Sequence, residues 1–594
     1  MKYIVGIDLG TTNSALAYIA SLVDDGAEKP LLAEVMPVPQ VVAAGSVLDR
    51  STLPSFMYLA AEGELPAGAL DLPWAEGRDF AVGAGARDRG AEVPLRLVSS
   101  AKSWLGHGAV DRRSPLLPFQ APPEVSKVSP ITASIRYLEH LRDAWATAHP
   151  DAPLAEQQVF LTVPASFDAV ARDLTVEAAR AAGLGDLTLL EEPQAAFYAW
   201  LERQGDSWRK TLKPDDQVLV ADVGGGTTDF SLIEVKDVEG NLTLERVAVG
   251  DHILLGGDNM DLALAHLASQ KLAADGKKLD AGQARSLLLA VRNAKEKLLG
   301  DATVESQPIV LLGRGSKMIG NKITTTLERE EIQRVLVEGF FPATTLDAPV
   351  VQARRTGFME LGLPFANDTA ITRHLAAFLR KHSKNGRLPT HLLFNGGVFN
   401  SPVLRSRLVE VMSGFGATPT VLEDADPDLA VARGAAYFGA SKGGKGIRIR
   451  GGVARSYYVG IETAMPAVPG MRPPIRALCV VPFGMEEGTS LGVPSGELGL
   501  VVGEPVTFRF LSSTARKDDR PGVMLDEYTW PEDLVETAPL ELTLAPEGVE
   551  PGTLVPVRLE VKVTEIGTVE VWCARTDGPG RWRLELNLRE AEAA

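Results

Sequence analysis

The sequence predicts an α/β protein with two similar lobes, followed by a domain built only of β-strands. Three observations lead to this fold class. A glycine-rich strand–turn–strand pattern occurs twice, the chain changes to short β-patterned runs after Arg455, and its 594 residues exceed what one hydrophobic core normally holds. About two to four structural units are therefore expected.

The repeated pattern is the strongest feature of the chain. Its first copy, IVGIDLGTTNSAL, occupies residues 4–16, and its second copy, VLVADVGGGTTDFSL, occupies residues 218–232. In each copy an apolar run meets an aspartate, a Gly/Thr-rich turn follows, and a second apolar run begins. Short apolar runs bounded by glycines are typical of buried strands, and so tight a turn between two of them predicts a hairpin.

The residue types in these turns suit a phosphate site. Glycine permits positive φ and lets backbone N–H groups approach phosphate oxygens, while threonine hydroxyls add further donors. An aspartate at the end of each first strand would hold a hydrated Mg²⁺ through water. Either copy alone could be an ordinary Gly-rich turn, but the pair in the same strand context favours two hairpins facing each other across a triphosphate.

Beyond this pattern, the residues resemble the Hsp70 chaperones, within the actin/hexokinase/Hsp70 superfamily. GIDLGTTNS and DVGGGTTDFS are similar to the two phosphate loops of that family. Further similar segments follow in the family's order: TVPASFDAVAR (162–172), EEPQAAFYAW (191–200), LLGGDNMD (254–261), FNGGVFNSPVLRSRL (394–408) and DPDLAVARGAA (426–436). The resemblance covers residues 1–440 and implies a two-lobed actin-like ATPase domain, a duplicated ribonuclease-H-like fold, that binds ATP or ADP with Mg²⁺.

The resemblance also assigns roles by position. It implies catalytic roles for Asp8, Lys102, Glu192, Asp222 and Thr227, with Lys102 and Glu192 positioning the attacking water. It places Mg²⁺ at Asp8, Asp222 and Asp229. It implies nucleotide contacts for Gly10, Thr11, Thr12, Asn13, Gly224, Gly225, Gly226, Thr228, Gly256, Gly257, Lys295, Gly396, Gly397, Val398 and Asp428. Such a site works by positioning and electrostatics. A solvated position remains the alternative for Lys102 and Lys295.

The nucleoside side departs from the family pattern. Val398 stands where a serine is expected, Asn400 where an arginine is expected, and Glu296 where some members place an arginine against the base. We therefore expect the preference for adenine to be less firmly determined than phosphate binding.

Residues 441–454 are Gly-rich and basic, which is typical of a flexible linker. They differ from the acidic, leucine-rich linker that the family uses to pass the nucleotide signal between domains. Pro164 and Arg172 do match the family's relay positions. Coupling between domains therefore stays open.

Residues 455–594 form several short runs that alternate apolar and polar side chains, which predicts a β-sandwich. RWRLELNLRE, for example, would place Trp582, Leu584, Leu586 and Leu588 on one face. The position of this domain resembles the substrate-binding β-domain of Hsp70, without residues for its helical lid. Met485 and Val493 would either line a peptide groove or belong to the packed core.

The bulk composition excludes some classes of protein. A net charge of −17 without a basic block argues against nucleic-acid or membrane partners. There is no signal-peptide pattern and no apolar run of about 18 residues. Cys479 and Cys573 are expected as buried thiols in a reducing compartment, and no cluster has zinc-ligand spacing. A cytoplasmic location is expected.

These features together predict an Hsp70-like chaperone ATPase whose slow ATP hydrolysis regulates the binding of unfolded polypeptide by the β-domain. The resemblance implies a J-domain-type co-chaperone and a nucleotide exchange factor as partners. The alternatives are a sugar-type kinase, which would need a cleft aspartate as base toward a substrate hydroxyl, and an actin-like assembly protein. Both leave the appended β-domain unexplained.

Overall fold

The computed structural model describes residues 2–585 except 21–31, 109, 168, 186, 239–240, 251–252, 313–321, 352–362, 364, 384–385, 424–425, 443–448, 451–452, 454, 465–473, 486–488, 514, 527–533, 537–539, 547 and 564–568. The chain divides into two compact units. Unit 1 comprises Met1–Ser166, Leu174–Leu242 and Gly250–Arg448, and unit 2 comprises Phe167–Asp173, Thr243–Val249 and Ile449–Ala594. Most of the linker expected at 441–454 lies outside the described residues.

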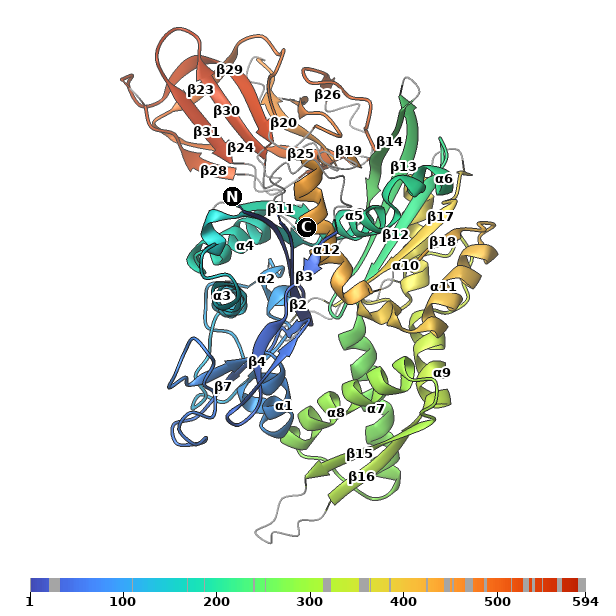
Figure 1. Ribbon diagram of the computed structural model, residues 1–594. Helices are drawn as coiled ribbons and strands as arrows, with labels where there is room; N and C mark the ends of the chain where they lie inside the picture. Colours follow the sequence, from blue (N-terminus) through green and yellow to red (C-terminus); the bar gives the residue numbers. More distant parts are fainter. Residues whose placement is uncertain are drawn as a thin grey trace. The chain divides into compact units, whose positions relative to one another are not determined.

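The first sheet of unit 1 forms around the first copy of the repeat (Figure 1). Two strands make an antiparallel hairpin, a third pairs in parallel with the first hairpin strand, and a fourth pairs in parallel with the third. The strands are β1 (Tyr3–Leu9), β2 (Asn13–Ala20), β10 (Gln158–Val163) and β11 (Leu187–Glu191), with β3 (Glu34–Val35) and β6 (Leu53–Pro54) pairing with β2. Val5 and Ile7 in the central strand are fully buried, as a strand covered on both faces requires.

The second sheet of unit 1 repeats this plan around the second copy. Its strands include β12 (Gln217–Val223), β13 (Thr228–Val238), β17 (His391–Asn395) and β18 (Thr420–Leu422). β12 and β13 form the antiparallel hairpin, β17 runs parallel to β12, and β18 runs parallel to β17. The repeat in the sequence is thus a repeat in topology, and both predicted hairpins are confirmed.

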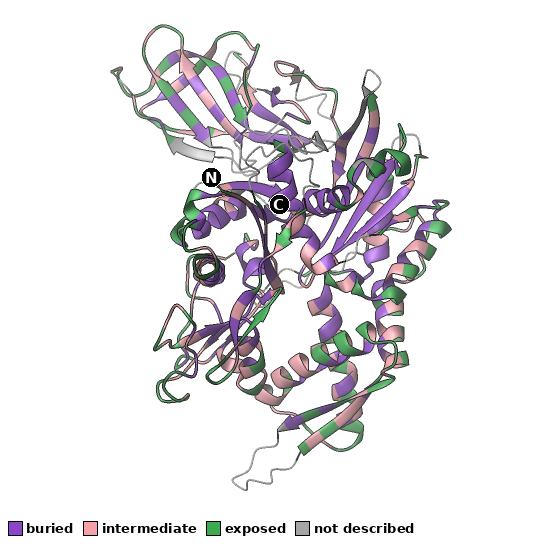
Figure 2. Cartoon of the chain, in the orientation of Figure 1, coloured by how far each residue is buried: buried purple, intermediate pink, exposed green. Residues whose placement is uncertain are grey.

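Two helices rich in small residues, α5 (Glu192–Gln204) and α12 (Pro427–Lys442), pack against each other, and α12 also covers β1, β2 and β10. A Cβ at Gly434 would lie 1.7 Å from the carbonyl oxygen of Ala195, and a Cβ at Gly6 would lie 2.2 Å from that of Ala432. Only glycine permits these approaches. Figure 2 shows α12 and α5 as almost wholly buried segments.

The first 448 residues also contain further helices and several small sheets. The helices are α1 (Ala84–Glu92), α2 (Ala101–Leu105), α3 (Pro130–Ala148), α4 (Ala169–Ala181), α6 (Trp208–Thr211), α7 (Gly257–Ala274), α8 (Ala281–Gly300), α9 (Arg329–Phe340), α10 (Ile371–His382) and α11 (Pro402–Gly414). Small sheets are formed by β4 (Val38–Ala43) with β5 (Ser46–Arg50), by β7 (Met57–Leu59) with β8 (Phe80–Val82) and β9 (Leu97–Val98), and by β15 (Ser306–Leu312) with β16 (Lys322–Glu328). No helix in the described part of the chain is both long and apolar enough to cross a bilayer.

Unit 2 contains the predicted β-sandwich. One sheet has the order β26–β21–β20–β25–β27, a second has β22–β29–β30–β31 with β23 beside β29, and β24 pairs with β28. The strands are β20 (Ser456–Glu462), β21 (Ile475–Val481), β22 (Ser490–Gly492), β23 (Leu498–Val502), β24 (Pro505–Phe508), β25 (Phe510–Ser513), β26 (Met524–Asp526), β27 (Val535–Glu536), β28 (Leu540–Thr543), β29 (Thr553–Val563), β30 (Val569–Arg575) and β31 (Arg581–Glu585). The segment EPVTFRFLSS is divided between β24 and β25, which belong to different sheets.

One hydrophobic core lies between the two larger sheets and includes Met485 and Val493, which are 8% and 6% exposed. These two residues therefore belong to the packed core rather than to an open groove. Trp582 and Leu584 are buried as the alternation predicts, whereas Leu586 and Leu588 lie outside the described residues. Both cysteines are buried free thiols, as expected.

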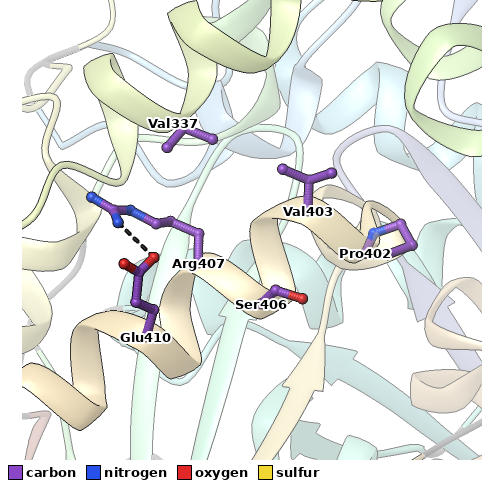
Figure 3. Close-up of a pocket in the computed structure, with 6 residues that line it drawn as sticks. All are labelled: Val337, Pro402, Val403, Ser406, Arg407 and Glu410. Carbon is purple, nitrogen blue, oxygen red and sulfur yellow. Dashed lines mark hydrogen bonds and ion pairs between the residues drawn. The ribbon is translucent and has the colours of Figure 1, made fainter. Parts of the chain in front are cut away.

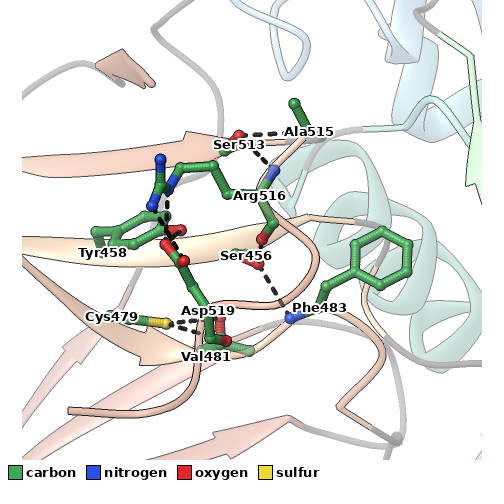
Figure 4. Close-up of polar contacts among 9 residues, drawn as sticks. All are labelled: Ser456, Tyr458, Cys479, Val481, Phe483, Ser513, Ala515, Arg516 and Asp519. Carbon is green, nitrogen blue, oxygen red and sulfur yellow. Dashed lines mark hydrogen bonds and ion pairs between the residues drawn. The ribbon is translucent and has the colours of Figure 1, made fainter. Parts of the chain in front are cut away.

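A buried polar cluster joins the loop before β26 to strand β20 (Figure 4). The Tyr458 hydroxyl and the Arg516 guanidinium both donate to the Asp519 carboxylate, each at 2.7 Å. Ser456 donates to the carbonyl of Arg516 at 2.7 Å and accepts from the backbone N–H of Phe483 at 3.1 Å. Each polar group here has a partner, as burial demands.

Two short segments from earlier in the chain also belong to unit 2. The second half of β14 (Asn241–Val249) runs parallel to β19 (Ile449–Arg450), with Leu244 opposite Ile449. Lys517 donates a hydrogen bond to the carbonyl of Val247. In the other segment, Arg172 donates to the carbonyl of Phe167 at 3.1 Å.

Candidate functional site

The first predicted phosphate loop, Gly10–Thr12, joins β1 to β2 and is held by contacts from Ser55. A Cβ at Gly10 would lie 2.0 Å from the carbonyl oxygen of Asn13, so the turn requires glycine. Ser55 donates its hydroxyl to the carbonyl of Gly10 at 2.7 Å and its backbone N–H to that of Thr12 at 2.8 Å. These two bonds hold the loop in one conformation.

The second predicted phosphate loop, Gly224–Thr227, is held by the start of α7. The N–H of Gly257 donates to the carbonyl of Gly224 at 3.0 Å, and the N–H of Asp258 donates to that of Gly225 at 2.7 Å. A Cβ at Gly256 would lie 2.6 Å from the carbonyl oxygen of Gly224, which explains the glycine at this position. The hydroxyl of Thr228 donates to the carbonyl of Leu255 at 2.7 Å.

The two loops meet. A Cβ at Gly225 would lie 2.0 Å from Thr12 Oγ1, and one at Gly226 would lie 3.1 Å from Thr11 Cγ2. The glycines of one loop thus face the threonines of the other without a side chain between them. Backbone donors and hydroxyls from both copies of the repeat converge on one point of unit 1.

Three aspartates stand at the ends of the hairpin strands beside these loops. Thr162, at the end of β10, donates to Asp8 Oδ1 at 3.2 Å, and Asn395, at the end of β17, donates to Asp222 Oδ2 at 2.8 Å. Asp229 lies directly opposite Asp222 in the hairpin register. The side chains of Ser166 and Thr227 donate to Asp229.

Burial raises the pKa of each of these carboxyls. It raises the pKa of Asp8 to about 7 and that of Asp229 to about 6. For Asp222 burial, followed by the charges of Glu192 and Asp229, raises the pKa well above its usual range. Several carboxyl groups close together in a buried site tend to be protonated unless a cation balances their negative charge.

Magnesium fits this donor set. Asp229 Oδ1 is buried and has no hydrogen-bond partner among the residues that the structure describes. Over the same residues, no group of three His, Cys, Asp or Glu side chains is arranged to ligate one metal ion directly. The buried carboxylates and the unpaired Asp229 Oδ1 would suit a hydrated Mg²⁺ held through water.

Lys102, on α2, forms an ion pair with Glu192, the first residue of α5. The two side chains are 8% and 13% exposed, which rules out the solvated surface position for Lys102. Burial alone would lower the pKa of Lys102, but Glu192 and Asp8 act against it and the net shift is upward. For Glu192 burial outweighs the attraction of Lys102, and the pKa is raised.

The residues expected on the nucleoside side also lie together. Lys295 Nζ is 3.3 Å from the carbonyl oxygen of Gly257 and 2.7 Å from Asp261 Oδ1. A Cβ at Gly257 would lie 3.5 Å from Lys295 Nζ and 3.6 Å from Val398 Cγ2. Lys295, with a side chain 12% exposed, is therefore not a solvated lysine.

The turn at Gly396 completes this side. Gly396 has φ of 84°, and a Cβ there would lie 2.4 Å from the carbonyl oxygen of Val223 at the end of β12. Asn400 donates to Asp428 Oδ2 at 3.0 Å. Gly397 lies near the other oxygen of the Asp428 carboxylate. A Cβ built on Gly397 would lie 3.5 Å from Asp428 Oδ1. Asn400, which stands where the family pattern has an arginine, is thus bound to Asp428.

Several residues of this neighbourhood were not among the predicted ones. Ser100 donates to Asp258 Oδ2 at 2.9 Å, and Arg292 pairs with both Asp258 and Asp261. Thr162 and Asn395 were missed although each is the polar residue that ends or nearly ends a buried strand. Their position at or near the end of a buried strand could have identified Thr162 and Asn395 from the sequence. No local feature of the sequence distinguishes Ser100 or Arg292.

A separate pocket of about 440 Å³ lies between α9 and α11 (Figure 3). Its lining residues are Val337, Pro402, Val403, Ser406, Arg407 and Glu410. Arg407 and Glu410 form an ion pair at 2.6 Å. None of the residues predicted from the sequence lines this pocket.

Comparison with known proteins points in one direction. The family described as Hsp70 protein matches residues 108–352. The chain is 30% identical over 448 residues to the chaperone protein HscA homolog of Bordetella pertussis, covering 73% of this chain and 57% of that protein. The HscA homolog of Methylococcus capsulatus is 30% identical over 445 residues, with the same coverage.

The HscA homolog of Pseudomonas aeruginosa is 34% identical over 316 residues, or 50% of this chain and 42% of that protein. The chain thus spans less than two thirds of the length of the curated relatives that it matches.

Proposed function

The chain belongs to the Hsp70 family, and from that premise we propose that unit 1 binds ATP with Mg²⁺ at its two phosphate loops and hydrolyses it slowly. One observation carries the proposal above all others. The buried Lys102–Glu192 pair lies among the aspartates that end the two hairpins, beside loops whose glycines face each other's threonines.

The two loops would hold the phosphate groups. Backbone N–H groups of Thr11, Thr12, Gly225 and Gly226 donate to phosphate oxygens, and the threonine hydroxyls add to them. Because these donors are positioned before the nucleotide arrives, little reorganisation is needed during the reaction. Lys295, Val398 and the Gly396–Gly397 turn would contact the nucleoside.

The terminal phosphoryl group of ATP, where hydrolysis takes place, would lie at Lys102. An upward-shifted pKa keeps this lysine protonated at neutral pH, so that it acts as a cation and not as a base. It offsets charge on the terminal phosphoryl group and, with Glu192, orients the attacking water. Asp8, Asp222 and Asp229 would hold the waters around Mg²⁺, which supplies neutralisation of phosphate charge.

The second half of the proposal concerns the β-domain. We infer that unit 2 binds unfolded or extended polypeptide and that the nucleotide state of unit 1 controls this binding. Support comes from the chaperone names of the relatives and from a sandwich that follows the ATPase-like unit. A J-domain-type co-chaperone, a nucleotide exchange factor and a cytoplasmic location, which suits two free buried thiols, complete the proposal.

The test of the ATPase is single-turnover hydrolysis by the purified full chain. Replacing Lys102 by Gln removes the positioned cation and should slow hydrolysis by about 100-fold or more, while ATP still binds. The Asp222→Asn variant should also be slow, because it loses a carboxylate needed around the metal.

A charge-matched control is Lys297→Gln, since Lys297 is an exposed lysine on α8. It should hydrolyse ATP at the rate of the unmodified chain. If Lys102→Gln behaved like this control, Lys102 would have no part in the chemistry. If the unmodified chain released no phosphate at all, the ATPase proposal would be wrong.

A further inference from the structure

Ser103, the residue after Lys102 on α2, has a hydroxyl that is buried and unsatisfied. The residue is 4% exposed. Its Oγ has no hydrogen-bond partner among the residues described by the structure. A buried hydroxyl normally finds a partner, and one that lacks it within the protein calls for an explanation, of which a bound ligand is one.

The hydroxyl is directed at the second phosphate loop. A Cβ built on Gly226 would lie 2.5 Å from Ser103 Oγ, closer than from any other side-chain atom. The same Cβ would lie 3.1 Å from Thr11 Cγ2 and 3.6 Å from Thr11 Oγ1. Gly226 is therefore flanked by a hydroxyl from the first phosphate loop and by that of Ser103.

The position along the loop indicates which part of the nucleotide Ser103 meets. Gly224 is bonded to Gly257, where Lys295 and Val398 converge on the nucleoside side. Gly225 contacts Thr12. Gly226, the next residue, contacts Ser103, whose neighbour Lys102 pairs with Glu192 at the reacting end. The contacts thus progress from nucleoside to terminal phosphate.

We propose that Ser103 Oγ donates a hydrogen bond to an oxygen of the terminal phosphoryl group of ATP. The inference rests on the proposed function of unit 1 as an ATP site. ADP lacks this phosphoryl group, so the bond forms with ATP alone. Ser103 is then a residue by which the site distinguishes ATP from ADP.

The experiment measures the affinities of the full chain for a slowly hydrolysed ATP analogue and for ADP, both with Mg²⁺, by calorimetric titration. In Ser103→Ala the affinity for the analogue should fall about tenfold, which is the loss expected for one hydrogen bond to a charged group. The affinity for ADP should stay within about twofold. The unliganded variant should unfold at the same temperature or higher, because an unpaired buried hydroxyl has been removed.

Ser134→Ala is the matched control, since Ser134 is a buried serine in α3 whose hydroxyl bonds to the carbonyl of Pro130. It should change neither affinity. Ser103→Cys keeps a side chain of similar shape, slightly larger than serine, but its thiol donates only weakly. It serves as the second variant if alanine disturbs the fold, and it should reproduce the selective loss.

An equal loss for both nucleotides would overturn the inference, because the hydroxyl would then support the pocket generally. No loss for either would overturn it as well. If the unmodified chain bound neither nucleotide, the failure would belong to the proposed function and not to the role of Ser103.

Discussion

His140, on α3, is a histidine that unit 1 keeps neutral. It is 3% exposed, and its Nε2 donates to the carbonyl of Pro39 at 2.8 Å, because a carbonyl can only accept. Its Nδ1 has no partner among the described residues, and the edge of Trp74 and the charge of Arg78 lie nearby. Burial lowers the pKa of His140 to about 4.

This histidine predicts a specific acid sensitivity. Because its folded-state pKa lies below its usual 6.5, the unfolded chain binds more protons as the pH falls. Its contribution to stability is complete above pH 6.5 and is lost towards pH 4, amounting to about 3 kcal/mol. Denaturant unfolding of the full chain at several pH values, compared with His140→Gln, measures it.

Comparing the unmodified chain with His140→Gln separates the pH dependence caused by His140 from that caused by the carboxylates, which both proteins share. Asp368, for example, has a pKa lowered to about 2, despite its burial, by hydrogen bonds from Arg373 and the backbone. It therefore loses its contribution at lower pH than His140 does. The difference between the two proteins should shrink between pH 6.5 and 4; parallel curves over that range would contradict the prediction.

At the scale of elements, the close packing of α5 against α12 depends on one missing side chain. Gly434→Ala would place a methyl group 1.7 Å from the carbonyl oxygen of Ala195, so the helices must separate. Overpacking of this kind should destabilise unit 1 by about 3 kcal/mol. Chemical denaturation monitored by tryptophan fluorescence would measure the change, since Trp200 is buried on α5.

Gly414→Ala provides the matched control. Gly414 is likewise a helical glycine, the last residue of α11, but a Cβ there meets nothing within 4 Å. Its replacement should be neutral or stabilise by up to about 1 kcal/mol, because alanine favours helix. If both variants lost the same stability, the cause would be the loss of glycine flexibility and not the contact with α5.

The elements also show what local sequence determines. Both hairpins follow from the pattern of Asp8 and Asp222 in apolar runs before glycine turns, and the structure has them with the expected pairing. Lys102 was identifiable only through the family resemblance, since a single lysine in AKSWLG has no distinguishing spacing. Ser103, for which we propose a phosphate contact, was missed because its neighbour Gly226 lies far away in the sequence.

At the scale of the molecule, two compact units were foreseeable from length and from the change of pattern after Arg455. Which segments of the chain belong to each unit could not be predicted. Phe167–Asp173 and Thr243–Val249 lie far from the β-domain in the sequence, yet they belong to unit 2. Local residue patterns define strands and helices, but they do not specify which distant surface a short segment joins.

The proposed control of polypeptide binding makes a prediction for the whole chain. An unfolded polypeptide in excess should accelerate ATP hydrolysis by about fivefold or more, the lower end of ordinary coupling between sites. Asp222→Asn should show no acceleration, because its hydrolysis is lost. Phosphate release measured with and without a reduced, unfolded protein gives the answer, with the same protein in its folded form as the control.

Hydrolysis at an unchanged rate in the presence of unfolded polypeptide would leave the ATPase in place but exclude this coupling. The sugar-type kinase and the assembly protein would then be tested next, by phosphate transfer to sugars and by sedimentation with ATP.

Unit 2 is built from three separate segments of the chain, which limits how recombination could exchange it. Its three pieces, Phe167–Asp173, Thr243–Val249 and Ile449–Ala594, are interleaved with those of unit 1. A genetic exchange at a single crossover point near residue 449 would therefore transfer a β-domain without two of its own segments. A hybrid with a β-domain from another relative would have to inherit all three pieces together.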